Sequence, residues 1–267
     1  MNRLFTDQLG RNISVSYPPC RIISLVPSQT ELLFDLGLDE EIVGITKFCI
    51  HPQEMVKNKL KTGGTKKLDL TKIRELKPDL IIGNKEENTK DQIEQLMKEF
   101  PVWMSDITNL DSALQMIREV GILVGKDGRA KYIADEIIFN FNSIDAIRGN
   151  LRIAYFIWKD PYIVAGKQTF IDDMINRLGC KNAFELERYP QLNVEDIRKV
   201  SPDVIFLSSE PYPFKEKHIK EFHSICPNTQ VLIVDGELFS WYGSRLKLSP
   251  PYFTLLQKEI MKNLNTI

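Results

Sequence analysis

The sequence is poor in histidine and cysteine, the side chains that most often bind transition metals. It has three histidines and four cysteines in 267 residues. The cysteines stand far apart, with no CxxC pair and no Cys/His cluster, which argues against a structural zinc site. We interpret them as small buried hydrophobic side chains, with a disulfide left open if the protein works outside the cytoplasm.

The histidines do not form a metal site either. His218 and His223 are five positions apart, so on a helix they would point in different directions. We interpret both as surface residues. Direct binding of a bare ion such as zinc or manganese is therefore not expected, and no metal ligands are assigned.

Long apolar runs and an excess of positive charge are also missing. No run approaches the roughly 20 apolar residues that cross a bilayer, and the start "MNRLFTDQLGRNISV" lacks the apolar segment of a secretory signal. We expect a periplasmic or other extracytoplasmic protein if a leader was removed, and a cytoplasmic one if Met1 is the true start. The net charge of −1, without a basic stripe, predicts no binding to nucleic acid.

Catalytic motifs are missing as well. The sequence has no GxSxG, no GxGxxG and no Walker A motif, and "GILVGKDG" has the wrong glycine spacing and follows a helix pattern. We assign no catalytic residues and no cofactor of the protein itself, and we expect a protein that is not an enzyme.

The chain does contain a repeated segment, "IRELKPDLIIG" in its first half and "IRKVSPDVIFL" in its second. In each copy, apolar residues at helical spacing lead to Pro-Asp and then to a short apolar run. Proline disfavours the helical conformation in the residue before it, so Pro78 and Pro202 should end the helices. The apolar runs are short and rich in β-branched residues, as in strands of a parallel sheet.

Other elements repeat in the same order. "RIISLV" and "RIAYFI" predict buried strands, each followed by a helix that ends at Leu-Gly, and "PVWMSD" and "QVLIVD" predict a third matched strand. This pattern predicts an α/β fold of two Rossmann-like lobes with mostly parallel sheets, joined by one long backbone helix. We expect lobes at residues 1–123 and 151–267, with the helix at 124–150.

In such sheets ligands bind beyond the carboxyl ends of the strands, which with two lobes predicts a cleft between them. Aromatic residues in the loops that follow the strands are candidates for stacking on a large flat ligand. For Trp158 and Phe214, packing between loops is an equal alternative. We favour the run Trp241-Tyr242-Gly243-Ser244-Arg245 as part of the site, with Arg245 able to bind a carboxylate or phosphate in bidentate fashion. The predicted ligand-binding set is Phe48, Thr65, Asn84, Trp158, Tyr162, Tyr189, Tyr212, Phe214, Trp241, Tyr242 and Arg245.

The order of motifs resembles a known family. "FTDQLGRNISV", "RIISLVPSQTELLFDLGLDEEIVGIT", "LDLTKIRELKPDLIIG", "GKQTFIDDMINRLGCKNAF" and "YPQLNVEDIRKVSPDVIFLSS" are similar to substrate-binding proteins of ABC importers for metal chelates, the helical-backbone metal receptors. The cobalamin-binding and iron-siderophore-binding members are the nearest in likeness, and haem binders are similar. The resemblance covers almost the whole chain.

The resemblance implies a monomeric binding protein that captures a corrinoid, siderophore or haem between its lobes. Phe48, Tyr189 and the "LFSWYGSR" loop match aromatic positions of the cobalamin binders. Thr65 and Asn84 depart from the pattern, because the cobalamin binders tend to have tryptophan there. The first lobe's wall is therefore expected to be more polar.

The resemblance also implies docking on an ABC permease through one acidic residue of each lobe. Glu86 and Glu210 hold equivalent places in the repeat, and Glu87 and Glu216 are neighbouring candidates. A solvated loop glutamate is the alternative for each, and Glu210 could instead face the ligand. The alternative for the whole chain is a two-lobed enzyme acting on a nucleotide or sugar-phosphate in the same cleft.

Overall fold

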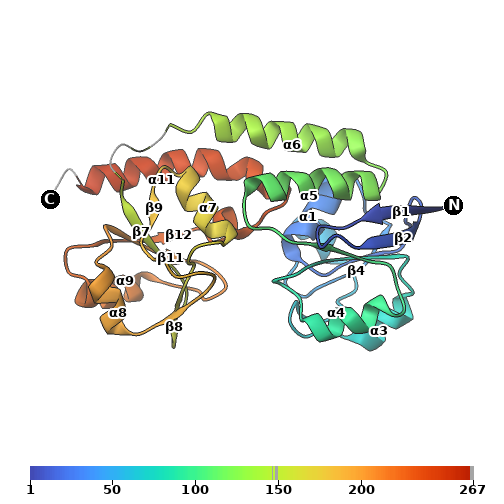
Figure 1. The fold of residues 1–267 in the computed structure, drawn as a ribbon, viewed down its shortest axis with the longest axis horizontal. Coiled ribbons are helices and arrows are strands. Elements are labelled where there is room, and N and C mark those ends of the chain that lie inside the picture. The colour runs from blue at the N-terminus through green and yellow to red at the C-terminus, as the bar shows by residue number, and fades with distance from the viewer. Residues whose placement is uncertain (146, 148–149, 265–267) are drawn as a thin grey trace. The chain divides into compact units, whose positions relative to one another are not determined.

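The computed structural model describes residues 1–145, 147 and 150–264, and they form two compact units (Figure 1). The first unit comprises Met1–Ile107, Asp111–Ile137 and Trp241–Arg245. The second comprises Thr108–Leu110, Ile138–Ser240 and Leu246–Ile267. The short segment Trp241–Arg245 therefore packs with the first unit although the chain on both sides of it packs with the second.

A parallel sheet of four strands forms the centre of the first unit. Its strands lie in the order β4-β3-β5-β6, and every neighbouring pair is parallel. The carboxyl ends of all four strands consequently lie at one edge of the sheet. The strands are β3 (Ile22–Ser24), β4 (Ile42–Ile45), β5 (Leu80–Asn84) and β6 (Val102–Ser105).

Helices cover both faces of this sheet. Figure 1 shows α3 and α4 on one face and α1 and α5 on the other. The side chains of Ile23 in β3, Leu25 just after it and Ile81 in β5 form one core with Ile73 and Leu96 of α3 and α4. The helices are α1 (Pro27–Asp35), α2 (Gln53–Val56), α3 (Leu70–Leu76), α4 (Lys90–Met97), α5 (Leu110–Leu123) and α6 (Asp127–Asn142).

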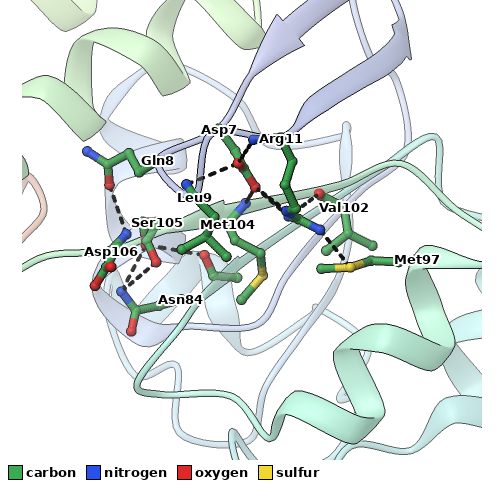
Figure 2. A network of polar contacts seen from close by, with 11 residues as sticks. Asp7, Gln8, Leu9, Arg11, Asn84, Met97, Val102, Met104, Ser105 and Asp106 are labelled. Atoms are coloured by element: carbon green, nitrogen blue, oxygen red, sulfur yellow. Dashed lines mark hydrogen bonds and ion pairs between the residues drawn. The ribbon is translucent and has the colours of Figure 1, made fainter.

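An antiparallel hairpin of β1 (Asn2–Thr6) and β2 (Asn12–Ser16) precedes the sheet and is attached to β6 by a buried carboxylate. Figure 2 shows Asp7, which accepts hydrogen bonds from the backbone N–H groups of Leu9, Arg11 and Met104 and also pairs with the Arg11 guanidinium. Because Met104 lies in the edge strand β6, this network fixes the hairpin to the edge of the sheet.

The second unit has a mixed sheet in the order β10-β8-β7-β11-β12, with β9 paired to β7. The pairs that join β7, β9, β11 and β12 are parallel, whereas β8 and β10 are antiparallel additions at one side. The strands are β7 (Arg152–Trp158), β8 (Tyr162–Val164), β9 (Lys181–Asn182), β10 (Gln191–Leu192), β11 (Val204–Ser208) and β12 (Gln230–Val234). The predicted α/β class with mostly parallel sheets is confirmed.

Helices again lie on both faces of the sheet (Figure 1). Phe156 and Ile205 pack with Ile197 and Phe222 of α8 and α9 on one face. On the other face the ring of Phe239 in α10 lies 5.1 Å from that of Tyr155. The helices are α7 (Phe170–Arg177), α8 (Val194–Val200), α9 (Glu216–Ile225), α10 (Glu237–Ser240) and α11 (Ser249–Leu264), and a 3-10 helix spans Ser244–Leu248.

The helix predicted for residues 124–150 is shorter than expected. α6 ends at Asn142, and Ser143 turns back on it, since both its backbone N–H and its hydroxyl donate to the carbonyl oxygen of Asn140. Residues 146, 148 and 149 of the predicted helix lie outside the described residues, and the domain boundaries drawn from the sequence stay predictions.

The two copies of the repeated segment form equivalent elements in the two units. They form α3 and β5 in the first unit and α8 and β11 in the second. The residues that directly follow these helices, Lys77 and Ser201, are both in the left-handed region, with φ of 45° and 46°. The prediction that Pro78 and Pro202 follow the helix ends is confirmed. Among the described residues, no helix combines the length and the apolar character needed to cross a membrane.

Candidate functional site

Phe48 follows β4, at the carboxyl edge of the first unit's sheet, and its ring is 50% exposed. One side of the ring lies against the backbone of Gly64, where a Cβ would come within 3.0 Å of Phe48 Cε2. Lys47 Nζ lies 5.0 Å from the ring centroid, a cation–π distance. The absence of a Cβ at Gly64 thus leaves room for the ring, and half of the Phe48 surface stays exposed.

Thr65 directly follows Gly64, and Asn84 is the last residue of β5; both make hydrogen bonds within the first unit. The Thr65 carbonyl oxygen accepts a hydrogen bond from the side chain of Asn88 at 3.1 Å. Asn84 is 1% exposed; its amide nitrogen donates to Ser105, and its Oδ1 accepts from the backbone N–H groups of Glu86 and Glu87 (Figure 2 shows the Ser105 contact). The roles predicted for both as ligand contacts stay predictions.

Trp241 and Arg245 are brought together in the first unit, around a bidentate ion pair. Arg245 Nε and Nη2 each lie 2.8 Å from an oxygen of Glu31 in α1, and both side chains are 13% exposed. The Arg245 guanidinium lies 5.2 Å from the Trp241 ring centroid, and the His51 ring packs edge-on against the same tryptophan at 5.5 Å.

Burial and the charge of Arg245 act in opposite directions on the pKa of Glu31. Burial raises the pKa of Glu31, and the hydrogen bonds and charge of Arg245 oppose that rise. The sequence predicted that the Arg245 guanidinium binds a carboxylate or phosphate of a ligand. In the structure this guanidinium binds the carboxylate of Glu31. Trp241 and Tyr242 are 7% and 6% exposed, so most of their ring surface is packed against protein.

The second unit brings Trp158, the last residue of β7, together with Tyr212 and Phe214, which follow β11. The rings of Trp158 and Tyr212 meet edge-to-face at 5.7 Å, and those of Tyr212 and Phe214 lie 4.7 Å apart. Trp158 is 40% exposed, whereas Phe214 is 4% exposed and packs in the core with Phe222. Phe214 is thus packed inside the second unit, and its role as a ligand contact stays a prediction.

His218 lies under these rings, and its assignment as a surface residue was wrong. It is 3% exposed, while His223 on the same helix is exposed as predicted. The reason is the loop that precedes α9, because Tyr212 and Phe214 fold back over the first turn of the helix and enclose the imidazole. An alternation of helix faces could not reveal this covering.

Tyr162 and Tyr189 lie elsewhere in the second unit. The Tyr162 hydroxyl donates to Glu221, which also pairs with Lys159 and whose pKa is lowered by these partners against the effect of its burial. Tyr189 is 38% exposed, with the Arg188 guanidinium 5.9 Å from its ring centroid.

The four glutamates differ in exposure and contacts. Glu216, in the first turn of α9, is exposed, and Glu86, Glu87 and Glu210 are half-buried. Burial raises the pKa of Glu87, against the opposing charge of Lys66. Glu210 Oε1 accepts a hydrogen bond from the Ser240 hydroxyl at 3.0 Å.

Residues important to these sites escaped the sequence reasoning. Glu31 and Glu221 are the internal partners of Arg245 and Tyr162, and no local motif marks either. Within the described part of the chain, no three His, Cys, Asp or Glu side chains gather as a metal site would require. Of the four cysteines, all of them free thiols, Cys49, Cys180 and Cys226 are buried as predicted, and Cys20 is exposed.

Known proteins resemble the chain over most of its length. It is 27% identical over 213 residues to an uncharacterized ABC transporter substrate-binding lipoprotein, YvrC, of Bacillus subtilis, covering 74% of this chain and 67% of the relative. It is 24% identical to a vitamin B12-binding protein of Pectobacterium carotovorum, covering 86% of each. The structure of the periplasmic heme-binding protein RhuT from Roseiflexus, in apo form, superposes with a TM-score of 0.78 at 22% identity, covering 90% of this chain and 98% of that one.

The family described as periplasmic binding protein matches residues 22–224, well over half of the chain. The proteins of this group bind substrates without converting them, so the chain is not an enzyme, and the alternative of a nucleotide or sugar-phosphate enzyme does not hold. The sequence of the chain, and the two α/β units into which it folds, make it a member of the periplasmic binding protein family.

Proposed function

We propose that this protein captures a cobalamin-like corrinoid, or another metal chelate such as an iron siderophore or haem, and delivers it to an ABC importer. The observation that carries the proposal is the exposure of Phe48, Trp158 and Tyr189, which are 50%, 40% and 38% exposed. Aromatic rings held by protein on one side and open on the other can stack on a large flat macrocycle. The names of the relatives favour the same ligand class, since one binds vitamin B12 and a structural neighbour binds haem.

The place of action that fits this proposal is outside the cytoplasm. The Bacillus subtilis relative is a lipoprotein, and the family is named for the periplasm. A chelate captured there must cross a membrane, which requires a permease as partner.

The test is direct binding of cyanocobalamin, haemin and a ferric hydroxamate siderophore to the purified protein. We expect one of them to bind saturably and to raise the unfolding temperature, since a ligand at 100 times its Kd stabilises a folded protein by about 2.7 kcal/mol. Calorimetry and thermal unfolding would measure both effects. No saturable binding and no thermal shift with any of the three would contradict the proposal.

A pair of phenylalanine variants tests the role of the exposed rings. Phe48→Ala should raise the Kd of the bound chelate by about tenfold. This change corresponds to the binding free energy lost with one aromatic contact and the apolar area that it buries. Phe139→Ala is the matched control, because Phe139 on α6 is 74% exposed and is not one of the predicted ligand contacts. Equal Kd values for the two variants would remove Phe48 from the site.

We also propose that Glu86 and Glu210 dock on arginines of the permease, with Glu87 and Glu216 as neighbouring candidates. Glu86 and Glu210 follow the equivalent strands β5 and β11, so a partner with a repeated surface could bind both. Charge pairs of this kind govern orientation and association rate. Changing Glu86→Lys and Glu210→Lys together should abolish chelate uptake by cells while the Kd of the chelate stays unchanged, and retention of uptake would contradict docking through these residues.

A further inference from the structure

His218 is a buried histidine with defined neighbours on both ring nitrogens. It lies in the first turn of α9 and is 3% exposed. The backbone N–H of Lys215 donates to His218 Nδ1 at 2.8 Å. His218 Nε2 lies 3.4 Å from the hydroxyl oxygen of Tyr212. Nδ1 is therefore an acceptor, which places the proton of the neutral ring on Nε2, directed at Tyr212.

The acceptor role of Nδ1 ties the aromatic loop to the helix. Lys215 directly follows Phe214, and its N–H is one of the donors that a helix start leaves without an intrahelical partner. The imidazole also packs edge-on against the rings of Tyr212 and Phe214, at 5.6 Å and 5.4 Å. One side chain thus holds both ends of the segment that carries these rings.

The same segment supports Trp158. Its ring meets that of Tyr212 edge-to-face at 5.7 Å, and it is 40% exposed. The orientation of the Trp158 ring therefore depends on the position of the Tyr212 ring, and so on the residues that hold Tyr212 in place. His218 provides part of that support, together with the ring of Phe214 at 4.7 Å.

A second proton on His218 would break this arrangement. Nδ1–H would then face the N–H of Lys215, donor against donor, and the bond would be lost. The charged groups around the ring are Lys159, which directly follows β7, and Lys217 and Glu221 of α9. Burial, with the charges of Lys159 and Lys217, lowers the pKa of His218, while Glu221 opposes that shift.

We propose that neutral His218 is a positioning residue that holds the Trp158–Tyr212 pair in its ligand-binding arrangement, so that the protein binds its chelate more weakly in acid. The proposal rests on the proposed function, because it assigns a supporting residue and a pH dependence to the same ligand contacts.

The pH dependence of binding tests it. Kd values for cyanocobalamin and haemin are measured at pH 7.5 and pH 4.5 in the wild type and in three variants. Because the pKa of His218 is lowered, we expect the wild-type Kd to stay constant near pH 7.5 and to rise by about threefold or more toward pH 4.5, as the histidine becomes charged. His218→Asn offers an uncharged acceptor to Lys215 at both pH values, so its Kd should change much less.

The other two variants are controls. His223→Asn changes an exposed histidine of the same helix and should keep the wild-type pH dependence. His218→Phe keeps a ring in place and removes the acceptor, so this variant should bind the chelate weakly at both pH values. It provides a second test if His218→Asn does not fold. Identical pH profiles for the wild type, His218→Asn and His218→Phe would overturn the positioning role.

A measurement without ligand separates this proposal from the proposed function. In NMR spectra of the imidazole nitrogens, we expect the Nε2–H tautomer at pH 7.5, and shifts of the Trp158 and Tyr212 ring signals as His218 titrates. An Nδ1–H tautomer, or ring signals that ignore the titration, would overturn the proposal. Failure of all chelates to bind, with these NMR results as expected, would contradict the proposed function and leave the positioning of the rings supported.

Discussion

Arg245 and Glu31 illustrate the different energetic consequences of removing one partner of a buried ion pair and removing both. Each side chain is 13% exposed, and two nitrogens of the guanidinium meet two oxygens of the carboxylate at 2.8 Å. The pKa of Glu31 is nevertheless raised by burial, so the pairing offsets only part of the cost of removing the carboxylate from water.

Changing only one partner should therefore be much more costly than changing both. We expect Arg245→Met to lower the free energy of unfolding by about 3 kcal/mol, because it leaves Glu31 buried beside an apolar chain. The double variant Glu31→Met with Arg245→Met should lie within about 1 kcal/mol of the wild type. Urea unfolding of the wild type, both single variants and the double variant measures the coupling. Additive losses in the double variant would show that the pair is not coupled in this way.

This pair also shows a limit of sequence reasoning at the residue scale. The bidentate capacity of Arg245 could be predicted from its chemistry, but its partner is 214 positions away and has no local signal. His218 could not be placed for a related reason. Its burial depends on Tyr212 and Phe214 folding over it, which the spacing of residues along α9 does not contain.

At the scale of elements, the Pro-Asp aspartate of the repeated segment takes part in hydrogen bonds that join the end of a helix to the start of a strand. In the first unit, Asp79 accepts hydrogen bonds from the backbone N–H groups of Cys20 and Arg21, both at 2.8 Å, and the Arg21 side chain donates to the last carbonyl oxygens of α3. In the second unit, Asp203 accepts a hydrogen bond from the backbone N–H of Arg152, and the Arg152 side chain donates to the carbonyl oxygens of Val200 and Ser201 at the end of α8. The aspartate thus binds the backbone at the strand start in both units, and the arginine side chain binds the carbonyl oxygens at the helix end.

Both of these helices are followed by a left-handed residue that is not glycine. Lys77 and Ser201 have φ of 45° and 46°, a region that costs a residue with a Cβ about 1 kcal/mol or more. We expect Lys77→Gly and Ser201→Gly each to raise the free energy of unfolding by about 0.5 to 1 kcal/mol. Lys77→Ala and Ser201→Ala are the controls, because alanine keeps the Cβ and should bring no gain. Chemical denaturation measures each change, and a loss with glycine would mean that the side chains contribute more than the backbone strain costs.

The elements that the sequence predicted well have a strong local pattern. The strands β3, β5, β6, β7, β11 and β12 are continuous apolar runs, and the helices α1 and α7 end at Leu-Gly, where Gly37 and Gly179 have φ of 87° and 86°. The antiparallel strands β8 and β10 were missed because they have only three and two residues, too few for a pattern to be recognised; β8 pairs with β7, and β10 pairs with β8.

At the scale of the whole molecule, the sequence repeat correctly predicted two α/β units, and it could not predict which unit receives each part of the chain. Trp241–Arg245 packs with the first unit, although its position in the repeat belongs to the second. Gly243 makes this packing possible, because a Cβ there would come within 2.4 Å of the Ser28 carbonyl oxygen in α1. A backbone approach this close is set by the assembled fold, and a single glycine in the sequence does not announce it.

The return of Trp241–Arg245 to the first unit also bears on how the protein would behave once its chain is cut. A protease that nicked the polypeptide just after α6 would produce two fragments, and the later fragment would carry the tryptophan and arginine that pack around Glu31 and His51 of the earlier one. Neither piece produced separately from its own gene would have all the side chains that complete the first unit.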